Sequence, residues 1–100
     1  MVMLTFNEFQ QRVIANSEYP LHGTGTTKPL AYVVMGLTRA AGELSRCTQQ
    51  FLVNDSVLSP DLKKQMLTET ARAMMFVAAL CAELGVTLDC VAGQKTKEHR

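Results

Sequence analysis

The sequence predicts an all-α protein, an antiparallel bundle of about four helices of which two are long. Two observations lead to this fold class. Apolar residues recur three and four positions apart along two long segments, as they do on one face of an amphipathic helix. Residues that favour helix ends stand between these segments, and no stretch alternates apolar and polar residues as a half-buried strand does.

The size and charge of the chain narrow its class. One hundred residues suit one domain with one core, so we expect a single helical domain over residues 1–100. A net charge of +1 gives no strong attraction to nucleic acid. No apolar run approaches the roughly 20 residues of a membrane span, and residues 1–9 lack the pattern of a signal peptide. We expect a cytoplasmic protein without membrane or nucleic-acid partners.

The three cysteines are expected to be structural. Cys47, Cys81 and Cys90 make an odd number and contain no C-x-x-C pair, which argues against a disulfide framework and a zinc site. Cys47 and Cys81 lie in apolar helical patterns, where a free thiol packs as a small hydrophobic group.

The first helix is predicted from its N-terminal signal. Thr5 and Glu8 have the spacing of a capping box, and apolar residues then recur at helical spacing to about Ala15. Glycine, proline and threonine make residues 17–29 a loop. Its segment from Gly23 to Lys28 follows no strand and lacks the G-K-[ST] ending of a phosphate-binding loop, so we interpret it as an ordinary connection.

The two long helices are predicted from apolar stripes. The first begins at Pro29, ends before Asn54, and has a stripe of Leu30, Val33, Val34, Leu37, Ala41, Leu44, Thr48, Phe51 and Leu52. Gly36 and Gly42 within it suggest the close approach of another backbone. The second begins at Ser59-Pro60, ends at Gly85, and has two stripes, which are Leu62, Met66, Thr70, Ala73, Val77, Leu80 and Leu84, and Ala71, Met75, Ala78 and Ala82. Two stripes predict a helix buried on two sides, and another subunit is one candidate for its second neighbour. A short helix over Leu88–Ala92 and a polar tail follow.

Several segments, in order, resemble the MazG-like nucleotide pyrophosphohydrolase family. They are Thr5–Gln10, Tyr19-Pro20, Gly36–Leu44, Ala78–Gly85 and Val86–Ala92. The resemblance covers nearly the whole chain, including the helix lengths. It implies a helical bundle that forms a homodimer or homotetramer, and a magnesium-dependent cleavage of nucleoside triphosphates to monophosphate and pyrophosphate. Single-domain relatives of this size look like those encoded by bacteriophages.

The family's metal site implies four carboxylates on two neighbouring helices. Its motifs have the form E-E-x-x-E on one helix and E-x-x-D on the next. Magnesium takes oxygen ligands in octahedral geometry and offsets the charge of the triphosphate while water attacks phosphorus. Acids three or four positions apart lie on one helix face, so two such helices can direct four carboxylates at a metal pair.

Carried onto this chain, the motifs are only half present. The first falls on Arg39, Ala40 and Glu43, and the second on Glu69 and Arg72. Of the four ligand positions, Glu43 and Glu69 keep an acid, and Arg72 places a permanent cation where a ligand is expected. We expect Arg72 to pair with Glu43 across the helix interface; Glu69, three residues before Arg72, offers a local pair instead.

Two functions follow from this reading. In the first, the chain is a pseudoenzyme that acts by binding a nucleotide or, as the favoured reading, a host or partner protein, as an inhibitor or adaptor. In the second, it is an active magnesium-dependent pyrophosphohydrolase that borrows acids such as Glu8, Glu18 or Asp55. His22 and His99 have no second ligand at useful spacing, so neither predicts a metal site.

Overall fold

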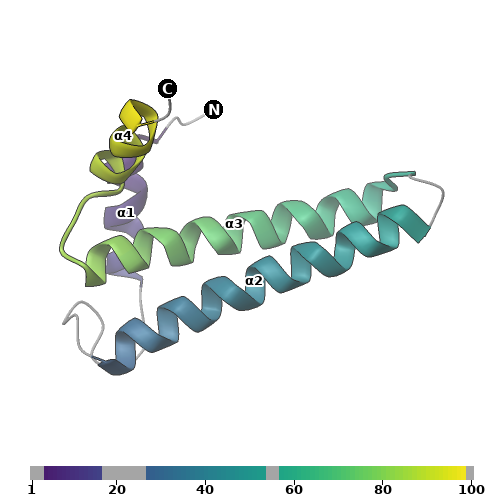
Figure 1. The fold of residues 1–100 in the computed structure, drawn as a ribbon, viewed down its shortest axis with the longest axis horizontal. Coiled ribbons are helices and arrows are strands. Elements are labelled where there is room, and N and C mark those ends of the chain that lie inside the picture. Colours follow the sequence, from purple (N-terminus) through teal and green to yellow (C-terminus); the bar gives the residue numbers. More distant parts are fainter. Residues whose placement is uncertain (1–3, 17–26, 54–56, 99–100) are drawn as a thin grey trace.

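The fold of the chain comes from a computed structural model, which describes residues 4–16, 27–53 and 57–98, with side chains as far as Gln94. These residues form four helices and no strand (Figure 1). The helices are α1 (Phe6–Ala15), α2 (Thr27–Val53), α3 (Pro60–Glu83) and α4 (Leu88–Glu98). The predicted all-α class is therefore confirmed for the described residues, whereas the finer MazG-like bundle stays a prediction.

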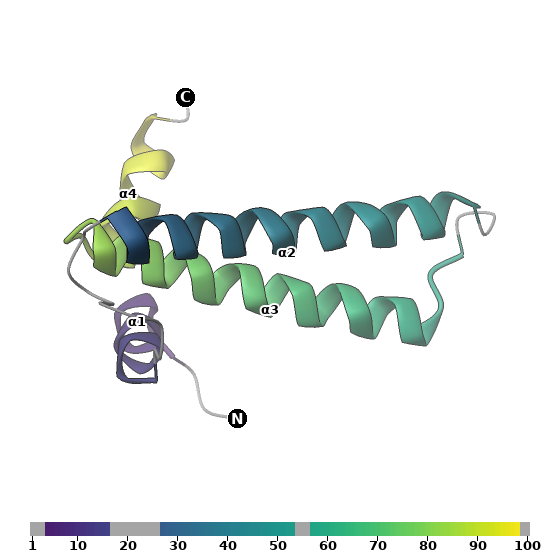
Figure 2. The same cartoon turned by 90° about the horizontal axis from the view of Figure 1, so that it is seen from below.

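The two long helices form the body of the molecule. α2 and α3 lie side by side, and the N-terminal end of α2 is beside the C-terminal end of α3 (Figures 1 and 2). α1 and α4 lie across this end of the pair and pack against α3 and each other. Among the described helices, α2 packs against α3 alone.

The predicted N-terminal signals of α1 and α3 are present. The hydroxyl of Thr5 accepts the N–H of Glu8 at 3.1 Å, and the Glu8 carboxylate accepts the N–H of Thr5 at 3.0 Å. The hydroxyl of Ser59 accepts the N–H of Leu62 at 3.1 Å, with Pro60 in the first turn. These bonds satisfy N–H groups that have no partner inside a helix, so the starts of both helices follow from local sequence.

α3 ends at the glycine that the sequence indicates. Gly85 has a φ of 73°, a left-handed conformation that side chains disfavour. This turn brings the N–H of Val86 to the carbonyl of Cys81 at 3.0 Å, and the N–H of Gly85 to the carbonyl of Ala82 at 3.2 Å. Both bonds are those of a Schellman cap, which satisfies the last carbonyls of the helix.

α4 is longer than predicted. The sequence indicates a short helix to Ala92 and a polar tail, but the helix continues to Glu98. The hydroxyl of Thr87 accepts the N–H of Cys90 at 3.2 Å, and the first turns pack against α1 and α3. A helix that is started by a cap and by packing adds further turns at little cost, so a polar sequence extends it.

The interior of the described part is built from small side chains. The buried hydrophobic residues are Val33, Ala40, Cys47, Leu62, Ala78, Ala79 and Cys81. Because α2 packs only against α3, its buried line of Val33, Ala40 and Cys47 must face α3. The predicted α2 stripe is centred to one side of this line, and its members Val34, Ala41, Thr48 and Leu52 are exposed.

The second stripe of α3 is only partly buried. Ala71 and Met75 are exposed, whereas Ala78 is buried and Ala82 is half-buried. The buried members lie toward the end of α3 where α1 and α4 pack. The second neighbour predicted for this part of α3 is therefore supplied by the same chain.

No single described helix is long and apolar enough to cross a membrane. α3 and the first part of α4 meet that standard of length and composition only as a pair bent by 99°.

Gln10 ties α1 to the turn between α3 and α4. Its side chain is 4% exposed, its Nε2 donates to the carbonyl of Val86 at 3.0 Å, and its Oε1 accepts the N–H of Leu88 at 2.9 Å. One amide thus satisfies a backbone acceptor and a backbone donor of the turn. A glutamine among the polar residues of an amphipathic helix gives no such signal in the sequence.

Replacing Gln10 should destabilise the protein more than replacing its neighbour. Gln10→Ala removes both bonds and leaves two backbone groups without their partner, so we expect a loss of about 1.5–3 kcal/mol in the free energy of unfolding. The exposed Gln11 is the matched control, and Gln11→Ala should change stability by less than about 0.5 kcal/mol. Equal losses of stability for the two variants in urea denaturation would contradict the role of Gln10 in joining α1 to this turn.

The two glycines of α2 have different surroundings. A Cβ at Gly36 would overlap the ring of Phe76, whereas a Cβ at Gly42 meets nothing within 4 Å. The predicted close approach is thus found at Gly36 only, and the neighbour is a side chain rather than a backbone. Gly42 has no packing reason in this structure.

Alanine at these glycines should have opposite effects. Gly42→Ala should stabilise the protein by up to about 1 kcal/mol through helix propensity alone. Gly36→Ala forces the Phe76 ring to move, at an overpacking cost of about 1–3 kcal/mol, so a net destabilisation is expected. Thermal unfolding of both variants checks the sign, and stabilisation by both would show that Phe76 does not occupy the space.

Candidate functional site

Two contacts define how α2 is aligned with α3. Gly36 lies against the ring of Phe76, and Sγ of Cys47 is 4.0 Å from Oε1 of Gln65. From the first contact to the second, α2 advances eleven residues while α3 recedes by eleven. The same alignment therefore holds along the segment between the two contacts.

This alignment brings the positions of the predicted site to facing surfaces. Glu43 lies four residues before Cys47, and Glu69 lies four residues after Gln65, so the two acids are opposite each other. Ala40 lies three residues before Glu43 and Arg72 lies three residues after Glu69, so Ala40 is opposite Arg72. Arg39 is exposed on α2. Four of the five predicted positions thus lie along the contact between the helices.

Each of the two acids is paired with an arginine of its own helix. Nη1 of Arg72 donates to both carboxylate oxygens of Glu69, at 2.7 and 2.8 Å, and Nε of Arg46 donates to Glu43 at 2.9 Å. The expected pair between Arg72 and Glu43 is therefore wrong, and the local alternative is correct. A partner three residues away on the same helix is already within reach, so pairing there orders fewer atoms than a bridge across the interface.

The two pairs form one cluster of alternating charge. The hydrogen bond that Arg46 donates to the Glu43 carboxylate is the main cause that raises the pKa of Arg46 above its ordinary value, and the negative charge of Glu69 on the other helix adds to the effect. The Glu69 side chain is only 15% exposed, whereas that of its partner Arg72 is 48% exposed. Two cations and two anions thus compensate one another where the resemblance implies four acids.

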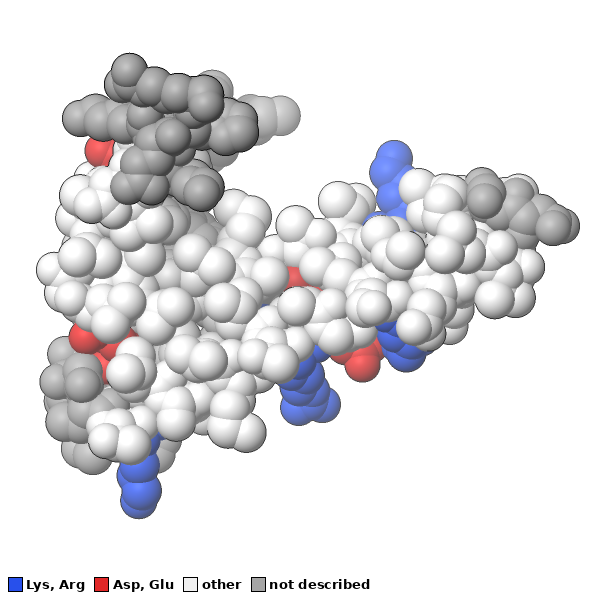
Figure 3. Space-filling model, in the orientation of Figure 1, with Lys and Arg blue, Asp and Glu red and all other residues white. Residues whose placement is uncertain are grey.

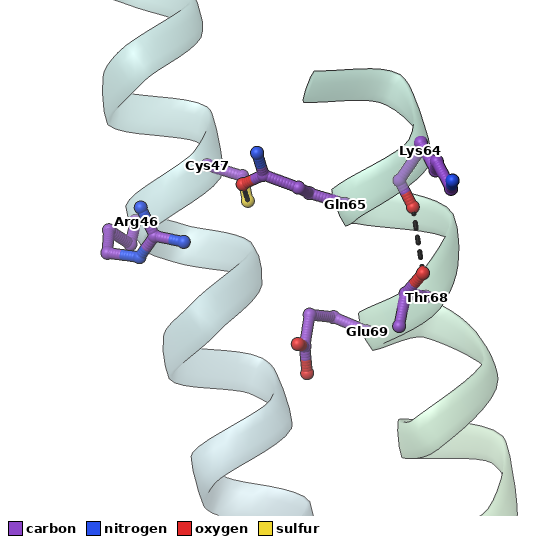
Figure 4. A pocket seen from close by; sticks show the side chains of 6 residues that line it. All are labelled: Arg46, Cys47, Lys64, Gln65, Thr68 and Glu69. Carbon is purple, nitrogen blue, oxygen red and sulfur yellow. Dashed lines mark hydrogen bonds between the residues drawn. The ribbon is translucent and has the colours of Figure 1, made fainter. Parts of the chain in front are cut away.

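A pocket of about 290 Å³ adjoins this cluster. It is lined by Arg46 and Cys47 of α2 and by Lys64, Gln65, Thr68 and Glu69 of α3. In Figure 4, Gln65 reaches from α3 toward Cys47, and Glu69 extends into the space between the helices. The Thr68 hydroxyl donates to the carbonyl of Lys64 at 3.0 Å and is therefore already satisfied. The pocket offers an amide, a carboxylate and two cationic side chains to a small polar group.

The other acids considered for the site contribute nothing to this region. Glu8 belongs to the cap of α1, and the N–H that Thr5 donates to its carboxylate is the main cause that lowers its pKa. Glu18 and Asp55 lie outside the described residues, as do His22 and His99. Among residues 4–16, 27–53 and 57–94, no three His, Cys, Asp or Glu side chains converge as metal ligands would.

Four polar residues of this region are absent from the sequence-based prediction. They line the pocket but match no family motif, and they are Arg46, Lys64, Gln65 and Thr68. The spacing of Arg46, three residues after Glu43, is a signal that would have predicted its ion pair. Gln65 and Thr68 carry no such signal, because their place depends on how α3 is aligned with α2.

Comparison of this chain with protein-family models, with curated proteins and with solved structures finds no match.

The cysteines provide a test of how closely the pocket is packed. Cys47 lines the pocket but is fully buried, Cys81 is buried, and Cys90 is exposed; all three are free thiols. Burial also raises the pKa of the Cys81 thiol, which leaves less of the reactive thiolate. We expect a disulfide reagent to modify one thiol rapidly and the other two only as the helices open.

The Cys90→Ser variant identifies the fast thiol. It should lose the rapid phase of modification and keep both slow phases, whereas Cys47→Ser should keep the rapid phase. The contrary outcome is a second thiol that still reacts rapidly in Cys90→Ser but no longer does in Cys47→Ser/Cys90→Ser. It would show that the reagent reaches Cys47 through the pocket.

Proposed function

We propose that this chain is a MazG-like helical protein that lacks metal-dependent hydrolysis and acts by binding, with a partner protein favoured over a nucleotide as its target. The observation that supports this proposal is the pairing of Glu69 with Arg72 and of Glu43 with Arg46. Both acids that remain of the family's ligand set are engaged by guanidinium groups.

The residues present do not fit a pair of magnesium ions. Ala40 provides no ligand atom, and Arg72 is a cation that remains protonated at any working pH. A divalent ion at Glu69 would have to displace a guanidinium that bonds both carboxylate oxygens and would then lie beside its positive charge. We therefore derive no hydrolytic step through a metal at this site.

The same region has features suited to recognition. Its charges alternate in sign, and the arginine side chains are half-exposed at 48% each, so they can bond acceptors on a partner without moving far. The pocket beside them has a volume of about 290 Å³, and we expect it to take one small polar side chain of the partner. A surface of this kind suits an inhibitor or adaptor of a host protein. We propose this role for the chain as a phage-type member of the family that acts in the host cytoplasm.

The decisive assay measures pyrophosphate release from the common and modified nucleoside triphosphates with magnesium. We expect no release above the protein-free rate. Release that disappears in Glu43→Gln and in Glu69→Gln would contradict the proposal and would support the active pyrophosphohydrolase instead. Release that survives both substitutions would point to a contaminating enzyme.

A variant that restores the acids of the family motif supplies the matched control. Ala40→Glu with Arg72→Asp restores acids at all four ligand positions, and we expect this variant to bind magnesium in calorimetry whereas the natural chain does not. The variant Ala71→Glu adds an acid outside the site on the exposed side of α3, and it should gain no magnesium binding. Magnesium binding by the natural chain would overturn the proposed loss of the site.

A third experiment searches for the proposed partner protein and tests whether it binds the surface around Arg46 and Arg72. The chain is used to capture proteins from a bacterial lysate, beside an Arg46→Glu/Arg72→Glu variant that reverses both exposed cations. We expect a specific protein bound by the natural chain and lost by the variant. A partner retained by both chains would place recognition elsewhere.

A further inference from the structure

Six charged residues lie on one side of the α2–α3 pair. We define the charged flank by these residues, which are Arg39, Glu43 and Arg46 on α2 and Lys64, Glu69 and Arg72 on α3. Steps of four and three residues place the three α2 members on one face of the helix. Arg46 lines the same pocket as Lys64 and Glu69. Because Arg72 bonds Glu69, all three α3 members lie on this side as well.

The charged flank is cationic at its two ends and acidic in its middle. Arg72 is opposite Ala40, the residue after Arg39, so two arginines lie at one end. Arg46 and Lys64 line the pocket at the other end, and the two glutamates lie between these ends. Because Arg39 and Arg46 are seven residues apart, the two cationic ends are about 10.5 Å apart along α2.

The paired arginines of the flank are more exposed than their acids. The Glu69 side chain is 15% exposed and that of Arg72 is 48% exposed. The corresponding values for Glu43 and Arg46 are 40% and 48%. A group that approaches the flank from outside therefore meets guanidinium groups more readily than carboxylates.

The flank also carries cations that no acid compensates. Arg39 and Lys64 are exposed, and neither forms an ion pair with a described residue. The next acid along α3 is Asp61 in its first turn, and counting it still leaves the flank with more cations than acids. In Figure 3, Lys and Arg side chains project from the lower edge of the α2–α3 pair, and acidic atoms lie between them. The charge of the flank is thus complementary to an acidic partner.

Each paired arginine keeps an edge of its guanidinium group for a second carboxylate. Arg72 bonds Glu69 through Nη1 alone, so its Nε and Nη2 form no bond with the described chain. Arg46 bonds Glu43 through Nε, which leaves its Nη1 and Nη2. Two neighbouring N–H groups of a guanidinium bind both oxygens of one carboxylate, so each arginine can hold a further acid without releasing its own.

The distance between the cationic ends matches the repeat of a helix. Residues seven apart lie on one face of an α-helix and are about 10.5 Å apart along its axis. On one face of a β-strand, side chains recur every second residue, at about 6.6 or 13 Å. A helix can therefore direct one acid at each end of the flank, whereas a strand has no pair of acids at that distance on one face.

The distribution of charge favours separate carboxylates over the phosphates of a nucleotide. A triphosphate concentrates its negative charge on adjacent groups, whereas the cations of the flank are divided between two ends. The acids Glu43 and Glu69 lie between these ends and would repel a phosphate placed there. Two carboxylates two helical turns apart meet both cationic ends and avoid the acidic middle.

We infer that the charged flank binds an acidic helix of another protein, whose carboxylates two turns apart bond the two cationic ends. A neutral side chain of this helix then lies between them and faces Glu43 and Glu69. The inference rests on the proposed binding function and names the class of partner for the same surface.

Nuclear magnetic resonance titration of the full chain with synthetic helices tests the inference. The acidic probe is a peptide of about 18 residues, long enough to be helical, built from alanine and glutamine with two glutamates seven residues apart. One control peptide replaces both glutamates by glutamine, and a second spaces them five residues apart, on different faces of the helix. At low salt the acidic probe should have a dissociation constant about 10-fold lower than the glutamine peptide and about 3-fold lower than the respaced peptide.

Variants of the chain show whether the charged flank is the surface that binds. Arg39→Gln/Lys64→Gln removes the two uncompensated cations, keeps both ion pairs and uses a good helix former. We expect it to raise the dissociation constant of the acidic probe at least about 5-fold. Arg12→Gln removes an exposed cation of α1 and should leave the binding of the probe unchanged.

Four results would overturn the inference. They are equal binding of the acidic and glutamine peptides, equal binding of the two glutamate spacings, full affinity in Arg39→Gln/Lys64→Gln, and displacement of the probe by a magnesium-free nucleoside triphosphate at a lower concentration than the probe itself requires. Circular dichroism confirms that each variant keeps its helices. Should the double variant unfold, Arg39→Gln alone replaces it, with the same expected direction and the same contrary outcome.

Failure of the inference and failure of the proposed function give different results. A protein captured by the natural chain and lost by Arg46→Glu/Arg72→Glu, without binding of the acidic probe, would keep the proposed function and reject the acidic helix. Binding of the probe together with magnesium-dependent pyrophosphate release, lost in Glu69→Gln, would keep the acidic helix and reject the proposed loss of hydrolysis.

Discussion

The contact between α2 and α3 determines the arrangement of the candidate site and of the surfaces on either side of it. It is built from small side chains, with Ala40 and Cys47 fully buried on α2 and the Phe76 ring of α3 filling the space above Gly36. Small groups let two helices approach closely, and close approach leaves little freedom for one to slide along the other. The single alignment that results decides which residues face each other and which flank they share.

This alignment separates two chemical surfaces on one pair of helices. On the charged flank, Glu43, Arg46, Glu69 and Arg72 form a compensated cluster beside a pocket. On the other flank, Val34 and Leu52 of α2 and Met74 of α3 are exposed. Glu43 and Glu69 are each held by an arginine of their own helix. This pairing is the observation on which the proposed binding role depends.

Local sequence predicted the helix ends well because local bonds make them. The pair of Thr5 with Glu8, the cap at Ser59 and the left-handed Gly85 each act within a few residues. The apolar stripe of α2 was less reliable, since Val34 and Leu52 are exposed although they belong to it. A stripe records every apolar position on a helix and does not say which of them a single neighbour will cover. The extension of α4 to Glu98 likewise depends on packing that a polar sequence does not record.

The sequence alone determined the helical class, the places where α1 and α3 begin, and the end of α3. The tertiary structure decided that Arg72 pairs with Glu69 rather than with Glu43, that Gln10 joins α1 to the turn before α4, and that Gln65 meets Cys47 at a pocket. The first set arises from bonds and spacings within one helix. The second set requires the relative position of two helices, which side-chain shape along their whole contact establishes and no local pattern contains.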